Sequence, residues 1–181
     1  MSDTVTIIED NDNVARAVFF PQMISSEGVL SRAIFSLRHN ESYISVCQMS
    51  IESWLDDIKK IPVNEDRQLN GYAVLNVGEV RNQTFMHDEQ KVELDVVDKH
   101  TDKNKSHAGI VIAFNGEGLK GDKESILKVL PPDTYAQTLL LRVQRRLLKL
   151  AYKHYVQMID MKIPDFGGFN ISEGVTHLKP R

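Results

Sequence analysis

His107 is the side chain that the sequence places best for acid–base chemistry. It stands between a wholly polar segment, DKHTDKNKS at 98–106, and an apolar run, AGIVIAF at 108–114. We expect the polar segment to be a solvent-exposed loop, so the histidine lies where the chain leaves water. An imidazole in such a place can exchange a proton near neutral pH. His107 is therefore a candidate general acid or base, and the alternative is a structural histidine with satisfied hydrogen bonds.

Charged side chains earlier in the chain could complete a catalytic site around this histidine. Arg32 and Arg38 could bind an anion, and Glu41 supplies a carboxylate. Ser45 and Cys47 carry nucleophilic atoms, although neither lies in a recognised nucleophile motif. If these side chains meet at one pocket, the expected function is a small enzyme for a nucleotide or another phosphate-bearing substrate.

A stripe of cations in the segment 133–160, DTYAQTLLLRVQRRLLKLAYKHYVQMID, is the second chemical feature. Its members are Arg142, Arg145, Arg146, Lys149 and Lys153. In a helix they share one face over about 18 Å, and no Asp or Glu lies between the two ends of the segment. The stripe predicts a ligand-binding surface for nucleic acid or another anionic partner. The alternative is a face that is solvated or paired with acidic side chains of the sheet.

Three glycines between a predicted strand and a predicted helix match the dinucleotide-binding pattern G-x-G-x-x-G. They are Gly116, Gly118 and Gly121. The rest of that unit is missing, because no acidic residue follows about 20 positions later and too little chain remains for a second half. The sequence therefore predicts no cofactor, and the glycines indicate a sharp exit from a sheet.

Metal ligands form no cluster in the sequence. Cys47 is the single cysteine, which excludes an internal disulfide and a cysteine-based zinc site. The run HDE at 87–89 has adjacent side chains that do not converge on one ion, and His100 and His107 flank a loop. A rigid metal site needs several fixed ligands, so none is predicted.

Length and composition are those of an ordinary globular domain. The chain has 181 residues, 41% hydrophobic and 26% charged, with a net charge of −3. One domain is expected for 1–181, with a ragged N-terminus at 1–13 and an irregular tail at 164–181. The acidic balance excludes general affinity for nucleic acid or membranes through overall charge. No signal-peptide pattern or membrane-length apolar run is present, and a cytoplasmic location is expected.

Periodicity and turn residues predict five or six strands. The expected strands lie at 14–20, 32–37, 42–48, 72–80, 92–96 and 108–114. The second and third form a hairpin around a turn at 38–41, and Asn70-Gly71 marks another turn. VELDV at 92–96 alternates strictly and is expected to be half-buried, whereas the run at 108–114 is apolar on both faces and is placed centrally in the sheet.

Three helices are expected, at 51–60, 122–130 and 133–160. Ser50 is the expected N-cap of the first, and the third has an apolar arc of roughly 220°, so most of its circumference is expected to be buried. Strands joined by turns and followed by helices predict an α+β fold. We expect a largely antiparallel sheet with the long C-terminal helix packed against it.

The function favoured by these patterns is that of a binding or accessory protein. It would engage a protein or an anionic partner through the cationic stripe, with no membrane involved and the oligomeric state open. The small enzyme built around the histidine is one alternative, and a structural assembly subunit is another. The runs RAIFSLRHNESYISV at 32–46 and SHAGI at 106–110 resemble stretches of small bacterial proteins, a likeness that implies no mechanism.

Overall fold

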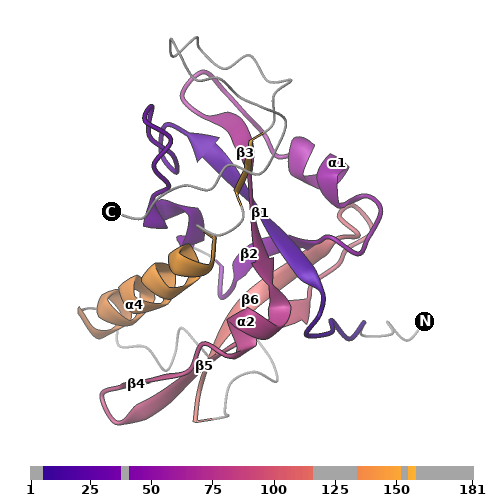
Figure 1. Cartoon of the computed structure of the whole chain (residues 1–181). Coiled ribbons are helices and arrows are strands. Elements are labelled where there is room, and N and C mark those ends of the chain that lie inside the picture. Colours follow the sequence, from indigo (N-terminus) through magenta and orange to yellow (C-terminus); the bar gives the residue numbers. More distant parts are fainter. Residues whose placement is uncertain (1–5, 38–40, 116–133, 152–154, 158–181) are drawn as a thin grey trace.

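One antiparallel β-sheet organises the protein. The structure is a computed structural model that describes residues 6–37, 41–115, 134–151 and 155–157. In these residues seven strands pair in the order β4-β5-β6-β2-β1-β3-β7 (Figure 1). The elements are β1 (Asn13–Phe20), η1 (Arg32–Phe35), β2 (Ile44–Gln48), α1 (Trp54–Lys59), β3 (Gln68–Asn76), α2 (Val77–Arg81), β4 (Phe85–His87), β5 (Gln90–Asp98), β6 (His107–Phe114), α4 (Thr134–Ala151) and β7 (Tyr155–Gln157). The α+β class and the antiparallel sheet are confirmed, with seven strands instead of five or six.

Three predicted strands are present, and the burial of each in the sheet matches the polarity pattern of its side chains. The strand at 14–20 is β1, the strand at 92–96 lies within β5, and the run at 108–114 lies within β6. In β5, Val92 and Leu94 are buried while Glu93 and Asp95 are half-buried, as alternation requires. β6 lies between β5 and β2 and is buried from Ala108 onward, which explains its apolar character on both faces.

The predicted hairpin of 32–37 and 42–48 is wrong. Residues Arg32–Phe35 form a 3-10 helix that begins after Ser31, whose Oγ accepts a hydrogen bond from the backbone of Ala33 at 3.1 Å. β2 pairs instead with β1 and β6, which come from distant parts of the sequence. The apolar residues of η1 are buried against α4, so tertiary packing outweighs the local preference for a strand.

The turn predicted at Asn70-Gly71 is also wrong, since both residues lie inside β3. The register between β1 and β3 shifts there, so that Val18 pairs with Gly71 and Phe19 with Leu69. Asn70 is the extra residue of this bulge, and its side chain accepts a hydrogen bond from the Tyr155 hydroxyl of β7. An asparagine–glycine pair can thus mark a bulge within a strand as well as a turn between strands.

Two predicted elements, a strand and a helix, needed correction at their ends. The strand expected at 72–80 stops at Asn76, whose side chain accepts a hydrogen bond from Glu79 N at 3.0 Å and so begins α2. The helix expected at 51–60 is shorter, since α1 spans Trp54–Lys59 and follows Ser53. Trp54 meets the ring of Tyr72 edge-on at 5.0 Å, which holds α1 against the sheet.

The long helix ends earlier than predicted. α4 spans Thr134–Ala151, and Tyr155–Gln157 leave the helix to pair with β3 as the edge strand β7. The apolar side of α4 is buried as expected, through Leu139, Val143 and Leu147. The predicted helix at 122–130, the glycine pattern at 116–121 and the predicted tail at 164–181 lie outside the described residues.

The two faces of the sheet carry separate apolar clusters. One face holds the larger cluster and is covered by α4, η1 and α2. The other face holds the smaller cluster and is covered by α1. Figure 1 shows α1 and α4 on opposite sides of the strands. We call these the core face and the α1 face. Residues that alternate along β1 and β2 therefore contribute to different environments.

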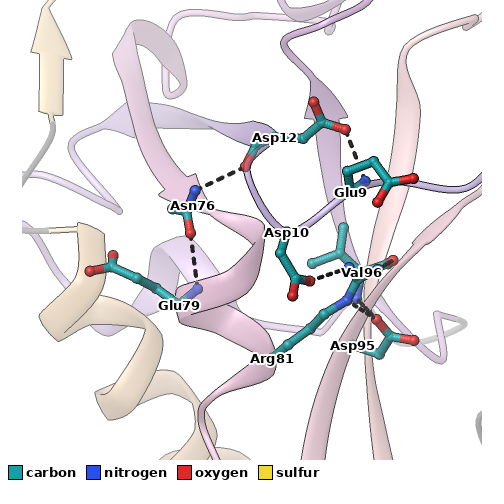
Figure 2. A network of polar contacts seen from close by, with 8 residues as sticks. All are labelled: Glu9, Asp10, Asp12, Asn76, Glu79, Arg81, Asp95 and Val96. Atoms are coloured by element: carbon teal, nitrogen blue, oxygen red, sulfur yellow. Dashed lines mark hydrogen bonds and ion pairs between the residues drawn. The ribbon is translucent and has the colours of Figure 1, made fainter.

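Arg81 of α2 fastens the N-terminal segment to the sheet. It donates to Asp95 Oδ1 and to Asp10 Oδ1, each at 2.6 Å, and Figure 2 shows its guanidinium between the two carboxylates. Burial acts to lower the pKa of Arg81, but these acceptors raise it overall. Ile8 is buried as well, so residues 6–12 are held against the sheet.

Candidate functional site

A cavity of about 380 Å³ opens on the α1 face, between the strands and α1. Its floor consists of small side chains from β1 and β2, namely Ala15, Ala17, Ser45 and Cys47. Apolar residues of α1 and the chain that follows it form one wall: Ile58, Ile61 and Pro62. These floor side chains are small, whereas the alternate residues of β1 and β2, on the core face, are larger. The small side chains leave room for a ligand on the α1 face.

Ser45 is the point at which two of the predicted catalytic residues meet. His107 Nε2 lies 3.3 Å from Ser45 Oγ, and the same hydroxyl donates to Glu41 Oε1 at 3.5 Å. The register between β2 and β6 pairs Ser45 with Gly109 and Cys47 with His107, so the imidazole reaches the serine diagonally. The structure thus brings His107 and Glu41 together at one hydroxyl.

His107 is held in a state that can accept a proton. Desolvation by burial lowers its pKa below the ordinary value of 6.5, and the nearby cations Lys99 and Arg16 act in the same direction. A hydrogen bond with the backbone of Lys99 and the charge of Glu41 oppose this shift without overcoming it. The ring is therefore neutral at pH 7, with Nε2 directed at the serine hydroxyl.

Tyr43 and Gly109 determine where the imidazole lies. The rings of Tyr43 and His107 are 5.6 Å apart and tilted by 56°. A Cβ at position 109 would lie 2.6 Å from Tyr43 Cδ2 and 2.8 Å from its Cγ. Only glycine at this position therefore allows the Tyr43 ring to lie across β6. Lys99 Nζ lies 5.4 Å from the centre of the same ring. Tyr43 is thus packed beside the imidazole from a position two residues before Ser45.

Arg16 is a buried cation at the cavity that sequence reasoning missed. Its Nε donates to the carbonyl of Ile34 at 2.9 Å, and its Nη1 donates to the carbonyl of Ser45. Only 7% of the residue is exposed. The sequence feature that could have indicated it is a single arginine inside the apolar strand VARAVFF, because a buried charge needs fixed partners. Arg16 brings positive charge to the backbone of the candidate nucleophile.

Cys47 does not have the properties of a nucleophile in this structure. Burial raises the pKa of its thiol, and the charge of Asp57 acts in the same direction. A hydrogen bond with Ser106 and the charge of Arg16 lower the pKa only in part. Because the reactive form of cysteine is the thiolate, Cys47 serves as part of the floor.

Asp57 joins α1 to the start of β6. Its carboxylate accepts hydrogen bonds from Ser106 Oγ at 2.8 Å, Ser53 Oγ at 3.0 Å and Lys60 Nζ at 3.3 Å. Burial acts to raise the pKa of Asp57, but these donors lower it overall. Ser106 is completely buried, so the prediction of a solvent loop at 98–106 is wrong at its C-terminal end. This network holds the wall of the cavity against its floor.

Arg67 is a second cation in the lining that the sequence did not reveal. It directly precedes β3, and its guanidinium carbon lies 3.8 Å above the centre of the Phe19 ring. Both residues line the cavity. They are distant in the sequence, and a lone arginine in a polar segment gives no sign of such a contact. The cavity therefore has a cation over an aromatic ring in addition to the serine and histidine.

Of the two other predicted catalytic residues, the one that the structure describes does not join this group. Arg32 begins η1, is exposed, and lies outside the lining of the cavity. Arg38 lies outside the described residues.

The predicted cationic stripe is divided by its contacts. Arg142 and Arg146 lie over the ring of Phe85 in β4, at 4.8 and 4.5 Å from its centre. Arg142 also donates to the carbonyl of Met86 at 2.9 Å. Arg145 and Lys149 are exposed. Lys153 lies outside the described residues, so two of the five cations face solvent in the part of α4 that is described.

Comparison with protein-family models, with curated proteins and with solved structures gave no match for this chain. Among the described residues, no helix has the length and apolar character needed to cross a membrane. In the same residues, no three His, Cys, Asp or Glu side chains gather where they could hold a metal ion. The geometry of the cavity is therefore the observation from which function is inferred.

Proposed function

We propose that this protein is a small enzyme that acts on a phosphate-bearing substrate in the cavity of the α1 face. The observation that carries the proposal is the position of Ser45 Oγ, 3.3 Å from a neutral imidazole and 3.5 Å from a carboxylate. Nucleophile, base and anion within reach of one another are the arrangement that nucleophilic catalysis needs. His107 is the general acid–base and Ser45 the nucleophile.

The proposed reaction is transfer of the phosphoryl group to Ser45 and then to water. The Ser45 hydroxyl first turns from Glu41 to His107 Nε2. As Ser45 Oγ then bonds to phosphorus, its proton passes to His107 Nε2, and the bond from phosphorus to the leaving oxygen breaks. The imidazolium then gives that proton to the leaving oxygen. In the second step water attacks the phosphorus of the phosphoserine and gives a proton to the imidazole. The bond from phosphorus to Ser45 Oγ breaks, the imidazolium returns the proton to Oγ, and inorganic phosphate leaves.

Two charged residues support this chemistry, one next to the base and one next to the nucleophile. Glu41 favours the protonated form of His107 through its negative charge, so it stabilises the imidazolium that forms during the reaction. Arg16 donates to the carbonyls of Ile34 and Ser45, and so it fixes the backbone that carries the nucleophile.

Phosphate release from a panel of phosphate monoesters and nucleotides tests the proposal. For a substrate that the wild type consumes, Ser45→Ala and His107→Gln should each lower kcat by about 10²- to 10⁴-fold. Lys59→Gln, an exposed change on α1, should leave kcat unchanged and serves as the matched control. The proposal fails if the wild type consumes no member of the panel, or if both cavity variants keep full activity.

The exposed cations of α4 support a second function, binding of nucleic acid or another polyanion. Arg145 and Lys149 are exposed one helical turn apart. Charge reversal of both, in Arg145→Glu with Lys149→Glu, should abolish salt-dependent retention on heparin or nucleic acid. A wild-type protein that shows no such retention would exclude this function, whereas it would leave the enzymatic proposal unaffected.

A further inference from the structure

Arg67 is held in a fixed position at the edge of the cavity. Its backbone closes a tight turn with Asn64, through hydrogen bonds of 3.0 and 3.1 Å in the two directions. Its guanidinium lies over the Phe19 ring, with 3.8 Å between the guanidinium carbon and the ring centre. A cation packed on an aromatic ring loses less freedom when it binds a ligand, because its position is already restricted.

The chemistry of a guanidinium restricts what it can bind. The group carries five N–H donors in a fork and no acceptor, so it recognises groups that offer acceptor oxygens. Carboxylates and phosphates match the fork with two parallel hydrogen bonds. In the cavity, Arg67 is therefore suited to an anionic group.

The acidic side chains in the lining are engaged with donors of the protein. Asp57 accepts hydrogen bonds from Ser106, Ser53 and Lys60. Glu41 accepts the hydrogen bond of the Ser45 hydroxyl. Among these donors Lys60 is the cation, and its ion pair at 3.3 Å offsets the charge of Asp57.

We infer that the natural ligand is a small molecule with an anionic group that pairs with Arg67 and an apolar body that packs on Ile61 and Pro62. The apolar wall and Arg67 belong to the same cavity, so one molecule can contact both. A phosphate or a carboxylate would satisfy the fork equally. This inference rests on the proposed function because both use one cavity, and it adds which end of the substrate is recognised and how.

Calorimetric titration of the full chain with three probes tests the inference without requiring turnover. The probes are phenyl phosphate, benzoate and benzyl alcohol, which share an apolar ring and differ in charge. Arg67→Gln should weaken binding of the two anions by about tenfold or more, and should change binding of the alcohol by less than about twofold. Arg67→Lys should recover only part of the loss, since an ammonium lacks the planar fork. A difference between phenyl phosphate and benzoate identifies which anion the site prefers.

A second variant locates the binding event. Ala17→Leu places a larger side chain on the floor and should weaken all three probes, because it fills the cavity without altering a charge. If the anions bind equally well to Ala17→Leu, they bind elsewhere and the inference is wrong. It is also wrong if no anion binds the wild type, or if Arg67→Gln weakens the alcohol as much as the anions. Thermal unfolding of each variant confirms that the chain is folded.

The inference and the proposed function fail in different ways. Anion binding that depends on Arg67, without phosphate release from any ester, would support the ligand class and overturn the enzymatic proposal. Turnover that depends on Ser45 and His107 but is unaffected by Arg67→Gln would support the enzymatic proposal and overturn the role of Arg67 in ligand binding.

Discussion

The two faces of the sheet are built by the same strands, and yet one forms a packed apolar cluster and the other the floor of a cavity. On the core face, β1 and β2 contribute branched aliphatic residues that are at most 2% exposed: Val14, Val18, Ile44 and Val46. On the α1 face, the alternate positions of these strands carry small or polar residues: Ala15, Ala17, Ser45 and Cys47. The first set belongs to the apolar cluster that also contains residues of η1 and α4, and the second forms the floor of a cavity.

This difference shows how one strand can position a site while it stabilises the fold. The side chains of the core face hold β1 and β2 in place, and the α1 face combines a smaller apolar cluster, which includes Phe19, Ile58 and Leu69, with the open volume of the cavity. Polar groups such as Ser45 and His107 can then face an open volume at fixed distances from each other. The following experiments test whether the two faces differ in this way.

The largest effect is expected from truncation on the core face. Ile110→Ala removes a completely buried side chain and should lower the free energy of unfolding by about 2–5 kcal/mol. Ala17→Leu on the α1 face enlarges a side chain beside open volume and should cost less than about 1.5 kcal/mol. Urea denaturation measures both. Equal losses would show that the volume above Ala17 cannot accept a larger side chain.

A smaller loss is expected where the α1 face is itself closely packed. Gly109→Ala would place a Cβ 2.6 Å from the Tyr43 ring and should cost about 1–3 kcal/mol through displacement of that ring. In a Tyr43→Ala background the same change should cost much less, because the clash is removed. Urea denaturation of the four proteins gives the coupling. Additive losses would contradict the contact.

Contacts at the edge of the core face should have a still smaller effect. Arg142→Gln removes the hydrogen bond to Met86 and the contact with Phe85, and should cost about 1–2 kcal/mol. Arg145→Gln is the matched control on the same helix, exposed, and should stay within about 0.5 kcal/mol. Thermal unfolding compares them. A cost at Arg145 as large as that at Arg142 would mean that α4 does not face β4 as described.

The smallest effect is expected from titration of His107. Its pKa is lower in the folded chain than the ordinary 6.5, with Lys99 and Arg16 adding to the effect of burial and Glu41 opposing it. Below pH 6.5 the unfolded chain then binds more protons than the folded chain, so stability is lost as the pH falls towards the folded pKa.

Urea titrations from about pH 8 to pH 5 measure this dependence. His107→Gln should remove the part of the slope that belongs to the imidazole, because glutamine does not titrate. An unchanged slope in the variant would show that His107 keeps an ordinary pKa in the folded chain.

The strands that sequence predicted well are those whose pattern depends on burial alone. Alternation at 92–96 and the apolar run at 108–114 both became strands of the sheet. The predictions that failed depended on local preferences that distant residues override. RAIFSL at 32–37 has the composition of a strand, but its apolar residues are buried in η1 beneath α4. Tyr155 was predicted inside the helix at 133–160, yet it pairs with β3 in β7, and its hydroxyl donates to Asn70.

The candidate site was visible from the sequence only in part. His107 and Glu41 stood out because a histidine at a buried boundary and a nearby carboxylate have recognisable chemistry. Arg16 and Arg67 did not, since each acquires its role from a contact with a residue far along the chain. The place of Tyr43 depends on the absence of a side chain at Gly109, which pairing between β2 and β6 brings beneath it.

By itself, the sequence determined the α+β class, the strands with strong alternation and the candidate histidine, because these depend on hydrophobic periodicity and on local changes of polarity. Tertiary structure alone decided the register that sets His107 beside Ser45, the burial of Arg16 and the stacking of Arg67 on Phe19. A shift of one residue in that register would turn every side chain of β2 to the opposite face. The candidate site therefore depends on distant segments pairing in one particular alignment.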